Sequence, residues 1–335
     1  MVFPKGRPST KLDSIFLLSH PPYQDYVEKT DHFPFGDNTM RIGISSYSYR
    51  RMVINRELTQ LEVIKKAKEA GFDVIEFARL TLPDGVEIRD FAKKIRDECD
   101  HVGMEIANYT IGADFINGYE GSGGDCDAEV ERLRSEIEIA RILGVPGMRH
   151  DATQGFSGDK PGAKGFDDAL PILAKGCREV TKMAADLGIK TMVENHGYFC
   201  QDSERVEKLV CAVNHPNFGV LVDMGNFVVV DEDPGTAVGR LIPYAFHFHA
   251  KDFHLKSGDA PFPGVGWNVS RGGNFWRGAI IGHGDVPVTQ CIRTIKQSGY
   301  DGVLSIEFEG MEDVLTSIDH CQTNLRRFID NIEQE

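Results

Sequence analysis

The sequence lacks the features that mark secreted and membrane-embedded proteins. Its seven cysteines are dispersed, and no two of them form a CxxC pair, so we expect reduced thiols in a reducing compartment. No segment approaches the ~20 consecutive apolar residues that cross a bilayer. The apolar run Ile15–Leu18 is too short for the core of a signal peptide and lacks a cleavage site. A cytoplasmic protein is therefore the default expectation.

Positive charge is also scarce. The 335 residues include 37 Lys and Arg against 51 Asp and Glu, which gives a formal net charge of -14. Binding to nucleic acid or to anionic lipid depends on cationic side chains that neutralise phosphates, so we expect neither as a partner. With 41% hydrophobic and 26% charged residues, the chain can bury a substantial core as one large domain or two ordinary ones.

Strand-like and helix-like segments alternate along most of the chain. The expected strands are Arg41–Ser46, Asp73–Phe77, Met104–Tyr109, Gly147–His150, Lys190–Glu194, Gly219–Asp223, Ala245–His249 and Val303–Glu307. The expected helices show apolar residues at helical spacing, and most are closed by glycine: Thr59–Ala70, Asp127–Leu143, Asp168–Leu187, Ser203–Val213, Val286–Ser298 and Met311–Ile329. About eight strand–helix units predict an α/β fold, a closed (β/α)8 TIM barrel over residues 40–335. A doubly wound open sheet is the alternative.

Two regions fall outside this alternation. Residues 1–39 contain several prolines and no sustained period, which predicts an irregular N-terminal extension. The segment Asp252–Asp285 is long and glycine-containing, and it carries Trp267, Phe275 and Trp276. We expect a long loop after the seventh strand, over the mouth of the barrel. Its aromatic residues either form a surface for a sugar or a partner, or pack on one another.

Four of the expected strands end in an acid or an imidazole: Glu194, Asp223, His249 and Glu307. Each closes an apolar run typical of a buried parallel strand, so the four side chains would meet at one edge of the sheet. Three carboxylates and an imidazole would repel one another without a cation, and this set suits a hard to borderline divalent metal. For any single residue a cap or a loop contact is the simpler interpretation, but four in successive units predict a shared metal site.

This constellation resembles the xylose isomerase-like barrel superfamily, which includes sugar isomerases, ketose epimerases, inosose dehydratases and apurinic-site endonucleases. The resemblance covers residues 41 to about 329. It rests on the Glu, Asp, His, Glu pattern, on the His-x-Lys-Asp signature that begins at His249 and on the strand end at Glu307. It implies Mn²⁺, with Mg²⁺ or Co²⁺ as alternatives. Where the nuclease branch has a ligand histidine three residues after the aspartate, this chain has Asn226, which argues against DNA repair.

The resemblance also implies a reaction type. In the sugar-converting branches a metal polarises a carbonyl and carboxylates move the proton of the neighbouring C–H, so Glu194 and Glu307 would be the catalytic pair as well as ligands. Further candidates follow the strand ends or lie in the long loop: Asn195, His196, Lys251 and His283. They could bind substrate hydroxyls, support the metal ligands or hold neighbouring loops. Glu309 and His247 are expected to point away from the barrel interior.

His150 closes the fourth strand and titrates near neutrality, so it is a candidate catalytic base facing the metal site. A structural histidine bonded to Asp151 is the alternative. Together with Arg277–Val286 and Glu307–Glu312, it resembles a subgroup, the larger subunits of bacterial C-glycoside deglycosidases. The subgroup implies a 3-oxo glycoside substrate that loses its aglycone from carbon 1 after a base removes the proton at carbon 2. It also implies a small partner subunit and a higher oligomer.

The sequence therefore predicts a metal-dependent enzyme that abstracts a proton next to the carbonyl of a keto-sugar. Elimination of the aglycone from a 3-oxo C-glycoside, with carbon–carbon bond cleavage, is the specific interpretation. Reprotonation by a keto-sugar isomerase or epimerase is the alternative, and a non-catalytic metal-binding barrel subunit is the second alternative.

Overall fold

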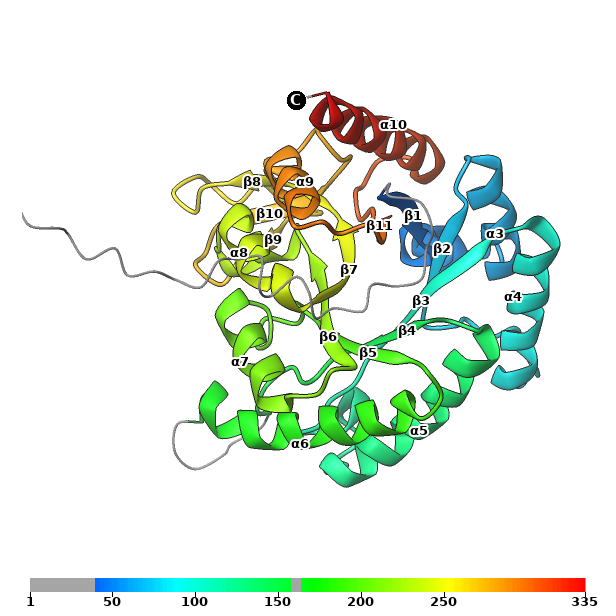
Figure 1. The fold of residues 1–335 in the computed structure, drawn as a ribbon. Coiled ribbons are helices and arrows are strands. Elements are labelled where there is room, and N and C mark those ends of the chain that lie inside the picture. The colour runs from blue at the N-terminus through cyan, green and yellow to red at the C-terminus, as the bar shows by residue number, and fades with distance from the viewer. Residues whose placement is uncertain (1–39, 158–163, 335) are drawn as a thin grey trace, which may run out of the picture. The chain divides into compact units, whose positions relative to one another are not determined.

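The computed structural model describes residues 40–157 and 164–334, so the predicted extension at 1–39 lies outside the described residues. Parallel strands form a closed barrel in the order β1-β11-β7-β6-β5-β4-β3-β2. These strands are β1 (Arg41–Ser45), β2 (Val74–Ala78), β3 (Glu105–Ile111), β4 (Gly147–His150), β5 (Lys190–Glu194), β6 (Phe218–Asp223), β7 (Ala245–Ala250) and β11 (Val303–Ile306). The (β/α)8 barrel is confirmed (Figure 1), whereas the domain boundary at residue 40 stays a prediction.

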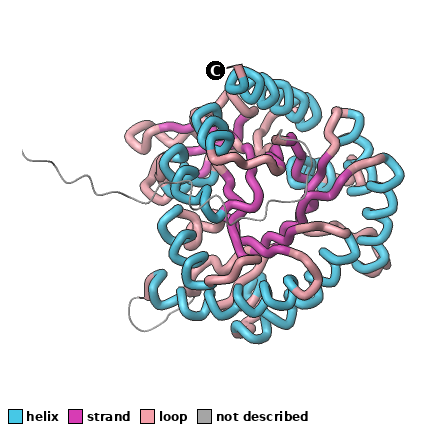
Figure 2. The backbone as a smooth tube through the Cα atoms, in the orientation of Figure 1, coloured by secondary structure: helices cyan, strands magenta, loops and turns pink. Residues whose placement is uncertain are grey.

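The helices surround the barrel (Figure 2). The long ones are α3 (Gln60–Glu69), α4 (Ile88–Val102), α5 (Cys126–Leu143), α6 (Phe166–Ala185), α7 (Ser203–Val213), α8 (Pro234–Leu241), α9 (Val288–Gln297) and α10 (Val314–Glu333). The short ones are η1 (Ser46–Tyr49), α2 (Arg50–Ile54), η2 (Tyr119–Gly121), η3 (Asn226–Val230) and η4 (Ile242–Tyr244). Among the described residues, no helix combines the length and the apolar character needed to cross a membrane.

Local sequence signals account for several element ends. Thr59 and Glu62 form a capping box at the start of α3, in which each side chain accepts a hydrogen bond from the other residue's backbone N–H. Asp125 caps α5 by accepting from the N–H of Ala128, and Gly144 ends that helix with φ 69°, a left-handed conformation that favours glycine. These signals set where each strand–helix unit begins and ends, and so which residues reach the barrel rim.

The long segment after the seventh strand contains a small sheet of its own. Its strands β8 (Asp252–Lys256), β9 (Asn268–Val269) and β10 (Phe275–Ala279) are antiparallel, in the order β8-β10-β9. The carboxylate of Asp252 accepts hydrogen bonds from the backbone N–H groups of Gly282, Gly284 and Val286. Asp252 therefore fixes the turn that leads from β10 to α9.

The aromatic residues of this segment pack locally. The rings of Trp276 and Phe253 lie 4.8 Å apart, and those of Phe275 and Phe262 lie 5.4 Å apart. Gly278 bridges to Gly310, next to Glu309, and a Cβ on Gly278 would collide with the carbonyl oxygen of Glu309. The segment thus supports the loop after β11. Of the two roles considered for its aromatic residues, packing on other aromatic rings fits Phe275 and Trp276.

Strand β4 determines which of two neighbouring residues enters the barrel. Arg149 points inward and reaches Glu194 of β5, with 2.7 Å between Nη2 and Oε2. His150 is fully buried on the other side of the strand, where its ring lies 5.8 Å from that of Phe115 and 6.2 Å from that of Phe218. The orientation predicted for His150, facing the metal site, is therefore wrong, because successive side chains of a strand point to opposite faces.

The environment of His150 is that of a structural residue. Its Nδ1 lies 2.8 Å from the carbonyl oxygen of Asp151, and burial lowers its pKa to about 4. A neutral ring that donates to a carbonyl and packs against two phenylalanines contributes to the core rather than to proton transfer.

We expect His150→Ala to lower the free energy of unfolding by about 2 kcal/mol, because it empties a packed site between two aromatic rings. Binding of Mn²⁺ should be unchanged. Urea denaturation and calorimetric titration measure the two effects. His101, exposed on α4, is the matched control, and His101→Ala should change stability by less than about 0.5 kcal/mol. Loss of metal binding at unchanged stability would show that His150 belongs to the site after all.

Candidate metal centre and substrate cavity

The four residues predicted as metal ligands come together at the carboxyl ends of β5, β6, β7 and β11. His249 Nδ1 lies 3.9 Å from Glu194 Oε1, 3.7 Å from Asp223 Oδ2 and 3.7 Å from Glu307 Oε1. Glu194, Asp223 and His249 are buried, and the Glu307 side chain is 12% exposed. The Nδ1 atom of His249 is buried without a hydrogen-bond partner. An orphaned nitrogen surrounded by carboxylate oxygens fits a divalent cation.

Backbone and amide contacts hold Asp223 in place. Its Oδ1 accepts hydrogen bonds from the N–H groups of Gly225 and Asn226, at 2.8 and 3.0 Å, which leaves Oδ2 to face His249. Asn195 joins β5 to β6: its Nδ2 donates to the carbonyl of Asp223 and its Oδ1 accepts from the N–H of Asp223, both at 2.8 Å. Of the roles considered for Asn195, the geometry favours support of a metal ligand.

Two buried cations offset the charge of the acids. Arg149 Nη2 lies 2.7 Å from Glu194 Oε2 and 2.9 Å from Asp151 Oδ1. Lys251 Nζ lies 2.9 Å from Asp223 Oδ2 and also contacts Glu307 Oε2. Burial by itself would lower the pKa of Lys251, but the neighbouring carboxylates hold that pKa well above its usual range, so the amine stays charged.

These cations leave each glutamate with one oxygen for the centre. Glu194 directs Oε2 to Arg149 and Oε1 toward His249, and Glu307 directs Oε2 to Lys251 and Oε1 toward His249. Asn226, which stands where the nuclease branch has a histidine, donates to Glu194 Oε1 at 2.9 Å. Each glutamate is therefore held through Oε2 by a buried cation, Glu194 at the end of β5 and Glu307 just after β11.

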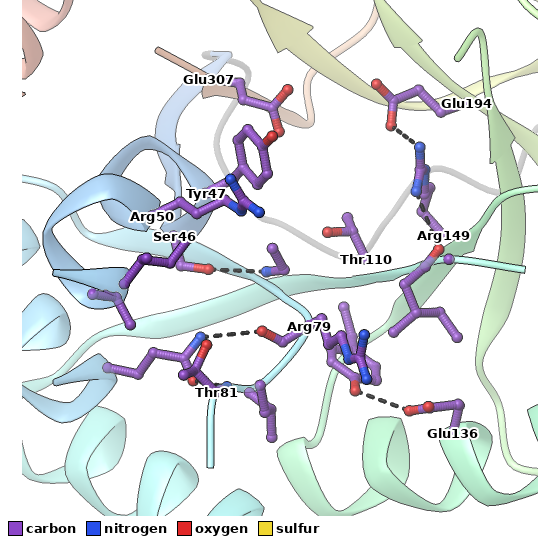
Figure 3. A pocket seen from close by; sticks show the side chains of 18 of the residues that line it. Ser46, Tyr47, Arg50, Arg79, Thr81, Thr110, Glu136, Arg149, Glu194 and Glu307 are labelled. Carbon is purple, nitrogen blue, oxygen red and sulfur yellow. Dashed lines mark hydrogen bonds and ion pairs between the residues drawn. The ribbon is translucent and has the colours of Figure 1, made fainter. Parts of the chain in front are cut away.

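A cavity of about 700 Å³ adjoins this centre. Its polar lining includes residues from the ends of β4, β5, β7 and β11: Arg149, Glu194, His196, Lys251, Glu307 and Glu309. Its apolar lining comes from α2, the segment after β2 and the start of α4: Val53, Ile54, Leu80, Leu82 and Ile88. Figure 3 shows Glu307 beside Tyr47 and Glu194 beside Arg149, facing each other across the space above Thr110.

The remaining predicted residues divide between the cavity and the surface. His196 lines the cavity, is 44% exposed and places Nδ1 2.9 Å from Asp151 Oδ1, and Lys251 lines it as well. Both lie where a substrate hydroxyl could reach them. His283 is exposed in the turn after β10, where its backbone N–H donates to the carbonyl of Ile280. It is not among the residues that line the cavity, so the structure does not bring it to the site.

Two orientations expected from the sequence are wrong. Glu309 lines the cavity, with Oε1 3.5 Å from Lys251 Nζ, and His247 points into the barrel, where Nε2 lies 3.0 Å from Glu76 Oε2. Residues two apart in a strand share a face, so His247 follows His249. The case of Glu309 differs, because β11 ends at Ile306 and the chain beyond it is no longer a strand.

Comparisons with known proteins agree with this architecture. A family model described as xylose isomerase-like TIM barrel matches residues 64–328. An inosose dehydratase from Clostridium botulinum is 25% identical over 158 residues, which are 45% of this chain and 50% of the relative. An L-ribulose-5-phosphate 3-epimerase from Escherichia coli is 24% identical over 254 residues, 74% of this chain and 81% of the relative. The chain thus spans about half the length of the inosose dehydratases that it matches.

Solved structures share the fold at low sequence identity. The IOLI protein with a bound zinc atom has a TM-score of 0.65 at 15% identity and covers 88% of this chain and 99% of its own. A xylose isomerase-like TIM barrel protein from Mycobacterium smegmatis, in complex with magnesium, has a TM-score of 0.62 at 16% identity and covers 89% and 99%. These likenesses concern the fold. The family match over residues 64–328, which are most of the barrel, shows that the chain belongs to the xylose isomerase-like TIM barrel family.

Proposed function

We propose that this protein is a divalent-metal-dependent enzyme that isomerises or epimerises a keto-sugar by removing the proton next to its carbonyl. The observation that carries the proposal is the position of Glu194 and Glu307, which belong both to the four-residue centre and to the wall of the cavity. The similarity to an inosose dehydratase and to a sugar-phosphate epimerase supports the same class of substrate.

The donor set suggests which ion the centre takes. Three carboxylates and one imidazole combine hard oxygen donors with a borderline nitrogen, so we propose Mn²⁺, with Mg²⁺ or Co²⁺ as alternatives. Glu194, Asp223, His249 and Glu307 would hold it. Bound there, the ion would polarise a substrate carbonyl and make the neighbouring C–H more acidic.

The side chains that line the cavity would transfer the proton and bind the oxygens of the substrate. Glu194 and Glu307 approach from two different walls of the cavity (Figure 3), so one carboxylate can remove a proton and the other can return one to the opposite face of the carbon. Burial raises the pKa of Glu194 despite the opposing effect of Arg149, and a raised pKa makes a carboxylate a stronger proton acceptor. Lys251 and His196 line the same cavity and would supply hydrogen-bond donors for substrate oxygens.

We expect the wild-type protein to bind a single Mn²⁺ ion and Asp223→Asn to weaken that binding by more than about tenfold, because the amide removes a charged ligand oxygen. Calorimetric titration of chelator-treated protein measures both affinities. Glu136→Gln is the matched control, since Glu136 lines the cavity but bonds to Tyr109 and Arg132 outside the centre. A wild-type protein that takes up none of the three ions would overturn the proposal.

Solvent exchange tests the chemistry. In D₂O with Mn²⁺, the wild-type protein should place deuterium on the carbon next to the carbonyl of a ketose from a panel of ketopentoses and ketohexoses, read by mass spectrometry and NMR. Glu194→Gln and Glu307→Gln should each slow the exchange by roughly 10²–10⁴-fold, the contribution of a general acid or base. Glu131→Gln, an exposed carboxylate paired with Arg134 on α5, should leave it unchanged. Exchange that survives either cavity substitution contradicts the assignment.

The apolar part of the cavity favours a second candidate, elimination of the aglycone from a 3-oxo C-glycoside. Ile54 and Leu82 line the cavity and are 56% and 41% exposed. A free keto-sugar has no apolar group to cover them, whereas an aromatic aglycone does. The first step, proton removal at carbon 2 next to the carbonyl, is shared. The electron pair of that C–H bond then forms a double bond between carbons 1 and 2 as the bond from carbon 1 to the aglycone breaks, and the aglycone carbon takes up a proton from the protonated base or from water. Because His150 lies outside the cavity, Glu194 or Glu307 would be the base. A small partner subunit remains part of this proposal.

Incubation with a 3-oxo C-glycoside and Mn²⁺ separates the two reactions, with released aglycone measured by liquid chromatography. If elimination occurs, Ile54→Asn should raise the KM for the glycoside roughly tenfold, since it removes apolar area from the aglycone site. Leu187→Asn is the control, because Leu187 is 47% exposed after α6 and away from the cavity. If ketoses interconvert while no aglycone is released, the proposal of elimination is wrong and the proposal of an isomerase or epimerase is supported.

A further inference from the structure

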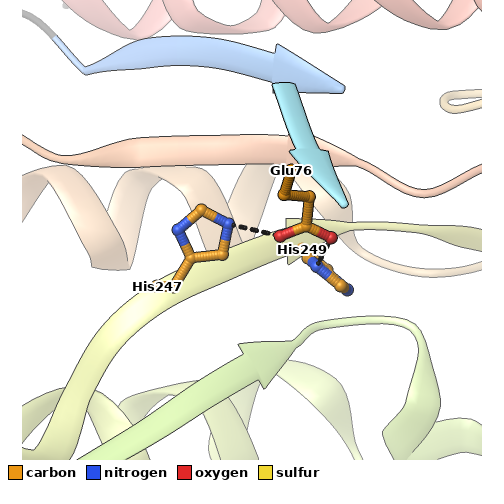
Figure 4. A group of neighbouring side chains, drawn as sticks. All are labelled: Glu76, His247 and His249. Carbon is orange, nitrogen blue, oxygen red and sulfur yellow. Dashed lines mark hydrogen bonds and ion pairs between the residues drawn. The ribbon is translucent and has the colours of Figure 1, made fainter. Parts of the chain in front are cut away.

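Next to the metal centre, a second group of titratable side chains lies inside the barrel. It consists of Glu76 of β2 together with His247 and His249 of β7 (Figure 4). The Glu76 and His249 side chains are 0% and 1% exposed. In the barrel order β7 is separated from β2 by β11 and β1, so Glu76 reaches across the interior to a strand that is not its neighbour. The proposed reaction gives Glu76 no part.

The carboxylate of Glu76 lies between the two imidazoles. Its Oε1 is 2.7 Å from His249 Nε2 and its Oε2 is 3.0 Å from His247 Nε2. His247 Nε2 also lies 3.0 Å from the hydroxyl oxygen of Ser305 on β11. The other ring nitrogen of His249, Nδ1, faces Asp223 and Glu307 at 3.7 Å. The imidazole ring of His249 therefore connects Glu76, through Nε2, to the metal centre, which Nδ1 faces.

A second metal ion between Glu76 and the histidines is the competing interpretation, since these residue types could hold one. Ligand atoms bonded to one tetrahedral ion at about 2.1 Å stand about 3.4 Å from one another. The separation of 2.7 Å between Glu76 Oε1 and His249 Nε2 is instead that of a charge-assisted hydrogen bond. The contacts of 3.7 to 3.9 Å around His249 Nδ1 leave the space that an ion needs.

The hydrogen bond has a consequence for the ring of His249. Each oxygen of the Glu76 carboxylate lies beside an imidazole nitrogen, which places Glu76 as a charged hydrogen-bond acceptor. An ionised carboxylate only accepts hydrogen bonds, so His249 Nε2–H donates to Glu76 Oε1. A histidine that binds a cation is neutral and carries a single proton. With that proton on Nε2, the lone pair of Nδ1 faces the space between the oxygens of Glu194, Asp223 and Glu307.

We propose that Glu76 is a positioning residue for the metal centre: its carboxylate sets the tautomer and the ring orientation of His249, so that Nδ1 faces Glu194, Asp223 and Glu307. The inference rests on the proposed metal-dependent function and deepens it. It adds a residue from the far side of the barrel that touches neither the ion nor the substrate. His247 Nε2 lies 3.0 Å from the second oxygen of Glu76, and Ser305 contacts His247 rather than Glu76.

Glu76→Gln tests this without changing the volume of the side chain. Calorimetric titration with Mn²⁺ should show affinity that is 10–100-fold weaker, the usual cost of losing a carboxylate that orients a ligand histidine, at unchanged stoichiometry. Ser305→Ala is the matched control: it removes a contact of His247 but keeps the bond between Glu76 and His249, and affinity should stay within about threefold. Equal affinity of Glu76→Gln and wild type, or two ions bound by the wild type, overturns the inference.

A measurement on the unaltered protein covers the case in which Glu76→Gln does not fold. Histidine-labelled (¹⁵N) protein loaded with ¹¹³Cd²⁺ should show metal coupling to Nδ1 of His249 and a retained proton on Nε2. Coupling to Nε2, or loss of its proton, overturns the inference while leaving a metal site in place. Absence of any binding by the wild type defeats the proposed function itself, and the inference with it.

Discussion

Repulsion among buried carboxylates at one rim of the barrel is the constraint on which the rest of the site depends. Glu194, Asp223 and Glu307 converge within a few ångströms of His249, and charges taken out of water are tolerated only when they are paired. Arg149 and Lys251 supply part of that pairing from the neighbouring strand ends. They leave one oxygen of each glutamate, and the bare nitrogen of His249, for a cation to complete the balance.

The sequence predicted the barrel and the grouping of the four ligands because both follow from strand ends. Apolar runs closed by a polar residue define where each strand stops, and parallel strands in a barrel present those ends at one rim. Inward and outward positions are harder to read in strands buried on both faces. Nothing in Arg149-His150 tells which residue enters the barrel, since both are buried. Glu76 lies inside an expected strand, but its partners come from β7, far along the chain.

The segment after the seventh strand shows a different limit. Its length and glycine content predict a loop rather than a small sheet. Strand β9 has only two residues, Asn268–Val269, which are too few to show an alternation of side chains. Strand β8 pairs with β10 through residues such as Asp252 and Ala279, which lie far apart in the sequence. A pattern of neighbouring residues therefore does not predict this pairing. His283 was expected at the site because it lies in this segment, yet Asp252 holds the turn so that His283 faces solvent.

The amide of Asn195 ties the ends of β5 and β6 together through two hydrogen bonds to the backbone of Asp223. These bonds are made entirely by the polypeptide, so the rim has its shape before any ion arrives. A preorganised site binds with little loss of chain entropy and can be emptied and refilled without unfolding the barrel. The fraction of protein molecules with an occupied site would then depend on the concentration of the ion around them rather than on how each chain folded.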